Sequence, residues 1–178
     1  AMHFLSSPGT WVFTLPLDGI DELILDPASP HQFVVSGESI KSLAATAWAI
    51  QLEQALYRLR AGEGKDGDVA FVAKYPDFHI ALSKAADGAI TFCMAPDTQG
   101  RVMAAVFTHE DALDLAFDEM QAHYAPSQVM ITKCDGPKLF GILAGMQLTG
   151  IVFNFSGPEK PVAFAAALAG ILLEEAAK

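Results

Sequence analysis

Apolar residues alternate with polar ones in some stretches of the chain and recur every three or four positions in others. The first pattern, rich in β-branched and aromatic residues, is typical of strands, and the second is typical of helices. We predict strands at 11–15, 23–25, 69–74, 78–82, 90–94, 102–107, 128–133 and 150–155. We predict helices from Ser36 or Ser39 to about Arg60, from Thr108 to before Tyr124, at 138–146, and from Pro161 to about Lys178.

The spacing of these elements predicts an α+β fold, with a mixed, largely antiparallel sheet packed with helices. We expect a single domain over 1–178, because the length is close to the usual size of ~150 residues per domain. Within it we expect a strand–helix unit at 1–61, a linker at 62–68 and a core at 69–178. The linker matches G-x-G-x-x-G, but it follows a helix and precedes a predicted strand, the reverse of a dinucleotide-binding turn.

Two segments of the chain resemble each other. DELILDPASP, from Asp21 to Pro30, aligns without a gap on TGIVFNFSGP, from Thr149 to Pro158, and an Ala-rich helix is expected after each. The match is compatible with an internal strand–turn–helix repeat and equally with chance, because many strand–turn–helix units share this pattern.

Composition narrows the class of protein. Apolar residues make up 52% of the chain and charged residues 18%, which excludes an intrinsically disordered chain. The formal charge of −10 argues against nucleic acid and anionic membranes as partners. The uncharged run at 139–158 contains several glycines and polar residues, so we expect buried elements and no membrane span. Only two cysteines, Cys93 and Cys134, and no visible signal peptide favour the cytoplasm.

No motif of a hydrolase, a P-loop or a metal site occurs, so we predict no catalytic residue, no metal ion and no cofactor. Polar residues at strand ends are the only candidate ligand-binding positions: Asp26, Thr108, Asp135 and Asn154. Such residues usually cap helices and form turns. The functional alternative is a shallow polar site at one edge of the sheet.

Two stretches carry a family resemblance. They are VMAAVFTHEDAL, from Val102 to Leu113, and LFGILAGMQLTGIVFNFSGP, from Leu139 to Pro158. Together they resemble the N-terminal domain of the SseB-like family, over roughly residues 68–178. Phe155 departs from the family pattern, which usually has Pro after the Asn at position 154. The resemblance implies a cytoplasmic bacterial α+β domain, and it supplies no catalytic residues.

We therefore expect a non-enzymatic protein-interaction or regulatory module whose partner is a protein or a neutral-to-cationic small ligand. A homodimer is compatible with the C-terminal helix, which is apolar on nearly every side. One alternative is a small hydrolase or transferase with a site at Asp26, Asn154 and a histidine. Another is a secretion-related adaptor or chaperone.

Overall fold

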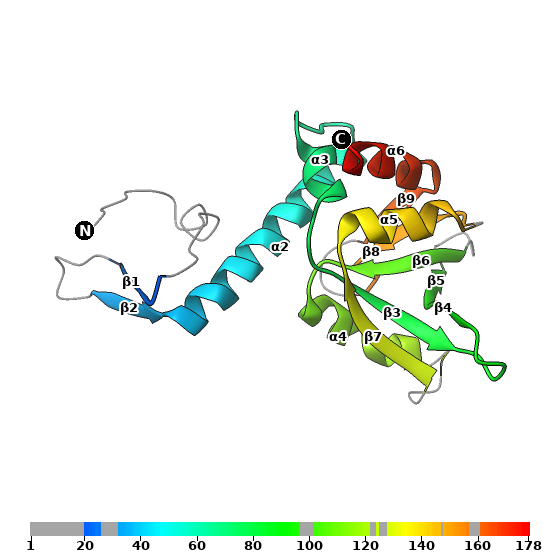
Figure 1. Ribbon diagram of the computed structural model, residues 1–178, viewed down its shortest axis with the longest axis horizontal. Helices are drawn as coiled ribbons and strands as arrows, with labels where there is room; N and C mark the ends of the chain where they lie inside the picture. Colours follow the sequence, from blue (N-terminus) through cyan, green and yellow to red (C-terminus); the bar gives the residue numbers. More distant parts are fainter. Residues whose placement is uncertain are drawn as a thin grey trace. The chain divides into compact units, whose positions relative to one another are not determined.

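A computed structural model describes positions 20–25, 32–96, 102–121, 124, 128–146, 148–156 and 161–178 (Figure 1). The predicted strand at 11–15 and the candidate residue Asp26 lie outside these positions. The chain divides into two compact units, and the boundary falls between Gln51 and Leu52. The helices of the described residues are α2 (Gly37–Ala61), α3 (Asp68–Ala73), α4 (Glu110–Gln121), α5 (Gly136–Ala144) and α6 (Ala167–Ala176).

The second unit contains a seven-stranded mixed sheet, which confirms the predicted α+β fold. Its strands are β3 (Phe78–Lys84), β4 (Ile90–Phe92), β5 (Met94–Pro96), β6 (Val102–Phe107), β7 (Val129–Cys134), β8 (Gly150–Phe153) and β9 (Val162–Ala165). β3 pairs with β7 along one edge and with β4 and β6 along the other. β6 also pairs with β5, β8 pairs with β6, and β9 pairs with β8. Only the β6–β8 pair is parallel.

Cys93 shows how β4 and β5 fit between β3 and β6. Its N–H donates to the Ala81 carbonyl at 2.8 Å, and its carbonyl accepts the Ala105 N–H at 3.3 Å. The segment that contains β4 and β5 therefore separates β3 from β6 at one end of the sheet, while the two strands pair directly at the other end. Among the described strands, β7 and β9 are left at the two edges.

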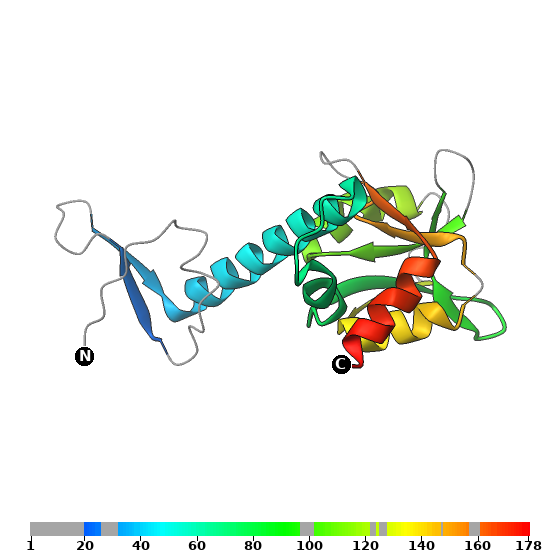
Figure 2. The same cartoon turned by 90° about the horizontal axis from the view of Figure 1, so that it is seen from above.

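Helices cover both faces of this sheet (Figures 1 and 2). Alternate residues of β3 and β6 point to opposite faces, and both sets are buried, because neither face of the central strands is open to solvent. One face carries Phe78, Ile80 and Val106, and it packs with residues of α3, α5, α6 and the part of α2 from Leu52 on. The other face carries Ala81, Ala105 and Phe107, and it packs with α4.

The predicted strand at 69–74 is wrong, because Asp68–Ala73 forms helix α3. Six residues are too few for periodicity to separate a strand from a helix, and Val69 and Val72 favour a strand by propensity. Tertiary contacts decide the outcome. The carboxylate of Asp68 binds Arg58 at the start of the helix, and Val72 and Ala73 are fully buried in the core.

The predicted helix start at Pro161 is also wrong. Val162–Ala165 forms β9, which pairs antiparallel with β8, and the terminal helix begins only at Ala167. The Ala-rich composition favours a helix, but pairing with β8 supplies the backbone hydrogen bonds that a strand needs. Val162 is buried and Ala163 is exposed, as expected for alternating faces of a strand.

The two segments of the expected repeat share one order of elements. In the first unit β1 (Glu22–Leu25) pairs antiparallel with β2 (Phe33–Ser36), and α2 follows directly. In the second unit β8 pairs antiparallel with β9, and α6 follows. Each segment is therefore a pair of antiparallel strands followed by a helix, and the second strand of each pair is not predicted from the sequence.

Candidate functional site

Two of the four candidate residues meet at the ends of the parallel strands β6 and β8. Thr108 follows β6 directly and Asn154 follows β8. Because adjacent parallel strands end at the same edge of a sheet, residues that follow them are neighbours. The Asn154 Oδ1 accepts the Thr108 backbone N–H at 3.0 Å, and the Asn154 N–H donates to the Val106 carbonyl at 3.0 Å. The sequence predicts both as strand-end residues, and the topology brings them together.

Glu53 of α2 and His109 complete a polar cluster with these two residues. The Thr108 hydroxyl donates to Glu53 Oε1 at 2.9 Å, and the Asn154 side-chain N–H₂ donates to the same carboxylate oxygen at 2.7 Å. The Asn154 Nδ2 also donates to Thr108 Oγ1 at 2.9 Å. His109 Nδ1 lies 2.8 Å from Thr108 Oγ1 and 3.5 Å from Glu53 Oε1.

Counting donors and acceptors shows that the hydroxyl and amide groups of the cluster bond to one another. A threonine hydroxyl has one hydrogen to donate and two lone pairs to accept with. The hydrogen of Thr108 is directed to Glu53, and the Thr108 oxygen accepts from Asn154. Both amide hydrogens of Asn154 are therefore used inside the cluster, one toward Glu53 and one toward Thr108.

Tyr75 closes the buried side of the cluster. Its hydroxyl donates to the Thr108 carbonyl at 3.4 Å, and its own carbonyl accepts the Gly136 N–H at 2.7 Å. Burial, together with the negative charges of Asp77 and Glu53, raises the pKa of Tyr75 to about 12. The ring therefore stays a neutral hydrogen-bond donor over the whole physiological range of pH.

The backbone at Asn154 fits this arrangement. Its φ of 49° lies in the left-handed region, which asparagine tolerates better than most residues with a Cβ. This conformation ends β8 with the carboxamide next to Thr108. The sequence predicts a polar turn former at this position, and the structure shows in addition that the side chain bonds to a neighbouring strand.

The cluster does not have the geometry of a nucleophile–histidine–acid relay. In such a relay the imidazole bridges the hydroxyl and the carboxylate through its two different nitrogens. Here the single atom Nδ1 of His109 faces both Thr108 and Glu53. Thr108 is 1% exposed, and its hydroxyl already donates one hydrogen bond and accepts another within the cluster. The arrangement is suited to holding strand ends together.

Asp135 has a different role. Its Oδ1 accepts the Lys138 N–H at 2.8 Å, so Asp135 is the N-cap of α5, with Pro137 in the first turn. It makes no hydrogen bond to Thr108 or Asn154. Asp26 lies outside the described residues, so it stays a prediction. Glu53, His109 and Tyr75 are not among the residues that the sequence predicts for the site.

His79, the histidine on β3, is buried on the face that packs with α4. Burial is the main cause that lowers its pKa, and the nearby positive charge of Lys133 lowers it further. Among the described residues, no group of three or more His, Cys, Asp or Glu side chains is arranged to hold a metal ion. No described helix is both long and apolar enough to cross a membrane.

A shallow open cleft lies at the end of α2, and its arginines are already engaged. The Arg58 guanidinium donates to both carboxylate oxygens of Asp68, at 2.8 and 2.6 Å. Arg60 Nη1 donates to the Pro161 carbonyl at 2.6 Å. The cleft is lined by Tyr57, Arg58, Arg60, Ala61 and Glu63. The described residues that line it present no convergent set of unused polar groups for a ligand.

Comparison of the chain with family models, with curated proteins and with solved structures finds no match. The resemblance to the SseB-like family therefore rests on the sequence motifs alone. In the structure these motifs coincide with the strand ends just described, since Thr108 belongs to the first motif and Asn154 to the second.

Proposed function

We propose that this protein is a non-enzymatic interaction module that associates with a second copy of itself through the outer surface of α5 and α6. One observation carries the proposal: large apolar side chains are exposed on two packed helices, with charged residues only at the two ends, Lys138 at the start of α5 and Glu174 and Glu175 at the end of α6. Ile142 on α5 is 43% exposed and Ile171 on α6 is 53% exposed. We call this surface the α5–α6 face, and it consists of Gly141, Ile142, Ala144, Ile171 and Leu173.

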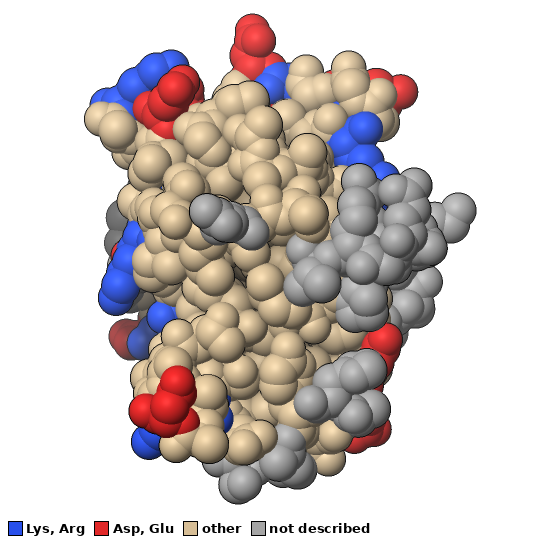
Figure 3. Space-filling model, turned by 90° about the vertical axis from the view of Figure 1, so that its right-hand side faces the viewer, with Lys and Arg blue, Asp and Glu red and all other residues tan. Residues whose placement is uncertain are grey.

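The two helices of the α5–α6 face pack against each other. Leu173 lies over Gly141, with its Cδ1 3.8 Å from the point that a Cβ on the glycine would occupy. The chain from 139 to 158 and from 161 to 173 contains no charged residue. Figure 3 shows the same scarcity of charge on the side where α5 ends and α6 begins, with charged side chains mainly at the margins.

Net charge opposes self-association, and it opposes it least at this face. Two molecules that each carry a formal charge of −10 repel each other, and the repulsion is smallest where the contacting surfaces carry no acidic residues. Ala144 is small and exposed, so it allows a helix of the second copy to approach closely. A two-fold contact also uses the same surface on both copies, so no second patch is needed.

The closed polar cluster supports a non-enzymatic role, because its hydroxyl and amide groups already bond to one another. We also propose a cytoplasmic location and kinship with the bacterial SseB-like family, on the sequence motifs and on two free, buried cysteines. A protein partner other than a second copy, and a small ligand, stay predictions.

Sedimentation velocity of the full chain tests the proposal. We expect a concentration-dependent dimer for the wild type and a monomer for the double variant Ile142→Glu/Ile171→Glu. The matched control is Ile90→Glu/Leu115→Glu, which adds the same charge at two exposed apolar residues outside the α5–α6 face. A wild type that stays monomeric, or a control that dissociates equally, would contradict the proposal. Circular dichroism verifies that both variants fold.

A further inference from the structure

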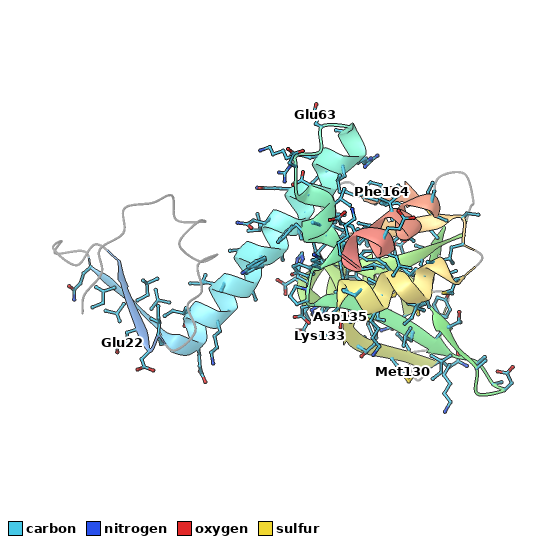
Figure 4. All side chains as sticks on the ribbon, turned by 45° about the horizontal axis from the view of Figure 1, so that its top comes forward. Glu22, Glu63, Met130, Lys133, Asp135 and Phe164 are labelled. Atoms are coloured by element: carbon cyan, nitrogen blue, oxygen red, sulfur yellow. The ribbon has the colours of Figure 1, made fainter. Side chains whose placement is uncertain are left out.

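The loop between α2 and α3 contains an Asp–Gly pair, Asp66–Gly67. Every residue of this loop, from 62 to 67, is exposed. Figure 4 shows Glu63 on the loop, at the margin of the second unit. An aspartate carboxyl reacts with the next backbone nitrogen most readily before glycine, because glycine has no side chain to obstruct the approach. The loop therefore holds a candidate site of covalent modification.

The same pair occurs elsewhere in the chain, so different surroundings can be compared. Asp87–Gly88 lies in the turn between β3 and β4, and Asp135–Gly136 lies at the start of α5. A further pair, Asp18–Gly19, lies outside the described residues. The aspartates of the three described pairs are all exposed. They differ in whether the two reacting groups, the aspartate carboxyl and the glycine N–H, already make hydrogen bonds.

Both reacting groups are bonded in the turn between β3 and β4. The Asp87 Oδ1 accepts the Ala89 N–H at 2.9 Å, and the Gly88 N–H donates to the Ala85 carbonyl at 2.9 Å. The Ala85 N–H donates in turn to the Ala89 carbonyl at 2.8 Å. The carboxyl can reach the glycine nitrogen only after the turn gives up two of these bonds, which slows the reaction.

Both reacting groups are also bonded at the start of α5. The Asp135 Oδ1 accepts the Lys138 N–H at 2.8 Å, and the Gly136 N–H donates to the Tyr75 carbonyl at 2.7 Å. Gly136 is buried, and a Cβ at this position would overlap the Ala73 carbonyl oxygen. The backbone of this pair is therefore held on both sides.

Asp66 and Gly67 lack such bonds. Among the hydrogen bonds between described residues, none uses the Asp66 carboxylate or the Gly67 N–H. The turn around them is closed by the flanking residues: the Asp68 N–H donates to the Lys65 carbonyl at 3.0 Å, and the Lys65 N–H donates to Asp68 Oδ2 at 2.9 Å. Neither reacting group has to leave a partner before the two can meet.

We propose that Asp66 isomerises to isoaspartate in the folded protein. The Gly67 nitrogen attacks Asp66 Cγ, and the new C–N bond closes a five-membered succinimide ring. The hydrogen of that nitrogen and the hydroxyl of the protonated carboxyl leave together as one molecule of water. Water then adds to the α-carbonyl carbon of Asp66 and breaks its bond to the nitrogen. The main chain now runs through Cγ, the α-carboxyl is free, and no oxidant or cofactor takes part.

The product changes the turn that positions Asp68. Isoaspartate adds one carbon atom to the main chain between Lys65 and Gly67, and the two bonds between Lys65 and Asp68 span this stretch. The Asp68 carboxylate also holds the Arg58 guanidinium, at 2.6 and 2.8 Å. The isomerised protein should therefore unfold at a lower urea concentration than the unmodified protein. In Asp68→Asn, which already lacks the charge-assisted pair, isomerisation should lower this concentration less.

Prolonged incubation of the full chain at neutral pH tests the site. Mass spectrometry of protease digests, with backbone fragments that distinguish isoaspartate from aspartate, measures each pair separately. In the folded protein we expect Asp66 to react about tenfold or more faster than Asp87 or Asp135, because each of those must first break two hydrogen bonds. In guanidinium chloride the three should react at similar rates, because the folded hydrogen bonds are absent.

Two matched variants check the chemistry. Gly67→Ala should slow the reaction of Asp66 several-fold, because the added Cβ obstructs the nitrogen. Gly88→Ala makes the same change at a second glycine with positive φ and open space, and should leave the rate at Asp66 unchanged. The proposal is overturned if Asp66 reacts only in denaturant, if Asp87 or Asp135 keeps pace with it in the folded chain, or if both variants slow it equally. The site is separate from the α5–α6 face, so either proposal can fail without the other.

Discussion

The carboxamide of Asn154 accepts the backbone N–H of Thr108 at 3.0 Å and so ties together the ends of two parallel strands. The same side chain donates to Glu53 on α2 at 2.7 Å. One residue therefore links two strands and a helix within the second unit. The backbone of Asn154 has a positive φ, and in this conformation its carboxamide lies next to Thr108.

Replacing Asn154 should lower the free energy of unfolding by two separable amounts. Asn154→Gly leaves the buried Thr108 N–H without its acceptor, which costs about 1–3 kcal/mol. Asn154→Ala has the same loss and adds about 1–2 kcal/mol, because alanine is strained at positive φ. Urea unfolding followed by circular dichroism measures both. If the two variants lower the free energy of unfolding equally, the left-handed backbone conformation at position 154 does not contribute to the difference.

Asp68 should make the free energy of unfolding depend on pH in the acidic range. The hydrogen bond from Arg58 is the main cause that lowers the pKa of the Asp68 carboxyl, and the Lys65 N–H adds to it. A carboxyl whose folded pKa is depressed stabilises the fold above its unfolded pKa of about 4, and this contribution is lost as pH falls through the folded value.

Asp68→Asn should therefore destabilise the protein at pH 7, by about 1.5–3 kcal/mol for the loss of charge-assisted hydrogen bonds. The difference from the wild type should shrink as pH falls below the unfolded pKa of about 4 and through the lower folded pKa. Urea denaturation over this pH range measures it. A difference that does not change with pH would show that the carboxylate charge contributes nothing there.

Replacing Gly150 and Gly170 by alanine should change the stability of the fold in opposite directions. A Cβ on Gly150 would overlap Met103 Cε and the Phe164 carbonyl oxygen, and the second contact is with the backbone of β9. Gly150→Ala should destabilise the fold by about 1–3 kcal/mol, as overpacked sites do. Gly170 lies within α6 and has open space around it, so Gly170→Ala should stabilise by about 0.5–1 kcal/mol. Thermal unfolding of the two variants compares them directly.

Cys93 should be inert toward thiol reagents in the folded protein. It is fully buried between β3 and β6, and burial raises its pKa to about 11. The thiolate is the reactive species, so it is nearly absent at pH 8. Mass spectrometry after iodoacetamide treatment should show Cys93 unmodified in buffer and alkylated in urea. Rapid native modification would mean that β4 and β5 open readily.

The sequence predicts most strands because their alternation is local. Runs such as 78–82 and 102–107 are bounded by turn residues, and both form strands of the sheet. α3 and β9 escape prediction for a physical reason. Their propensities favour the other state, and contacts with distant residues override those propensities.

The candidate site is predictable only in part. Thr108 and Asn154 can be found as polar residues at strand ends, but nothing near them in the chain points to Glu53. Glu53 is separated from them by 55 and 101 positions, and it lies on a helix with many polar positions. Only the parallel pairing of β6 with β8 defines the edge where these residues meet.

This separation also bears on how the protein forms during synthesis on the ribosome. Hairpins such as β3–β4 join neighbouring residues and can pair as soon as they emerge. The bonds from Asn154 to Thr108 and Glu53 span 46 and 101 positions. The cluster can therefore close only after synthesis has passed Asn154. Until then the edge of β6 that later receives β8 has no partner strand, and unpaired strand edges of incompletely folded chains are prone to aggregation.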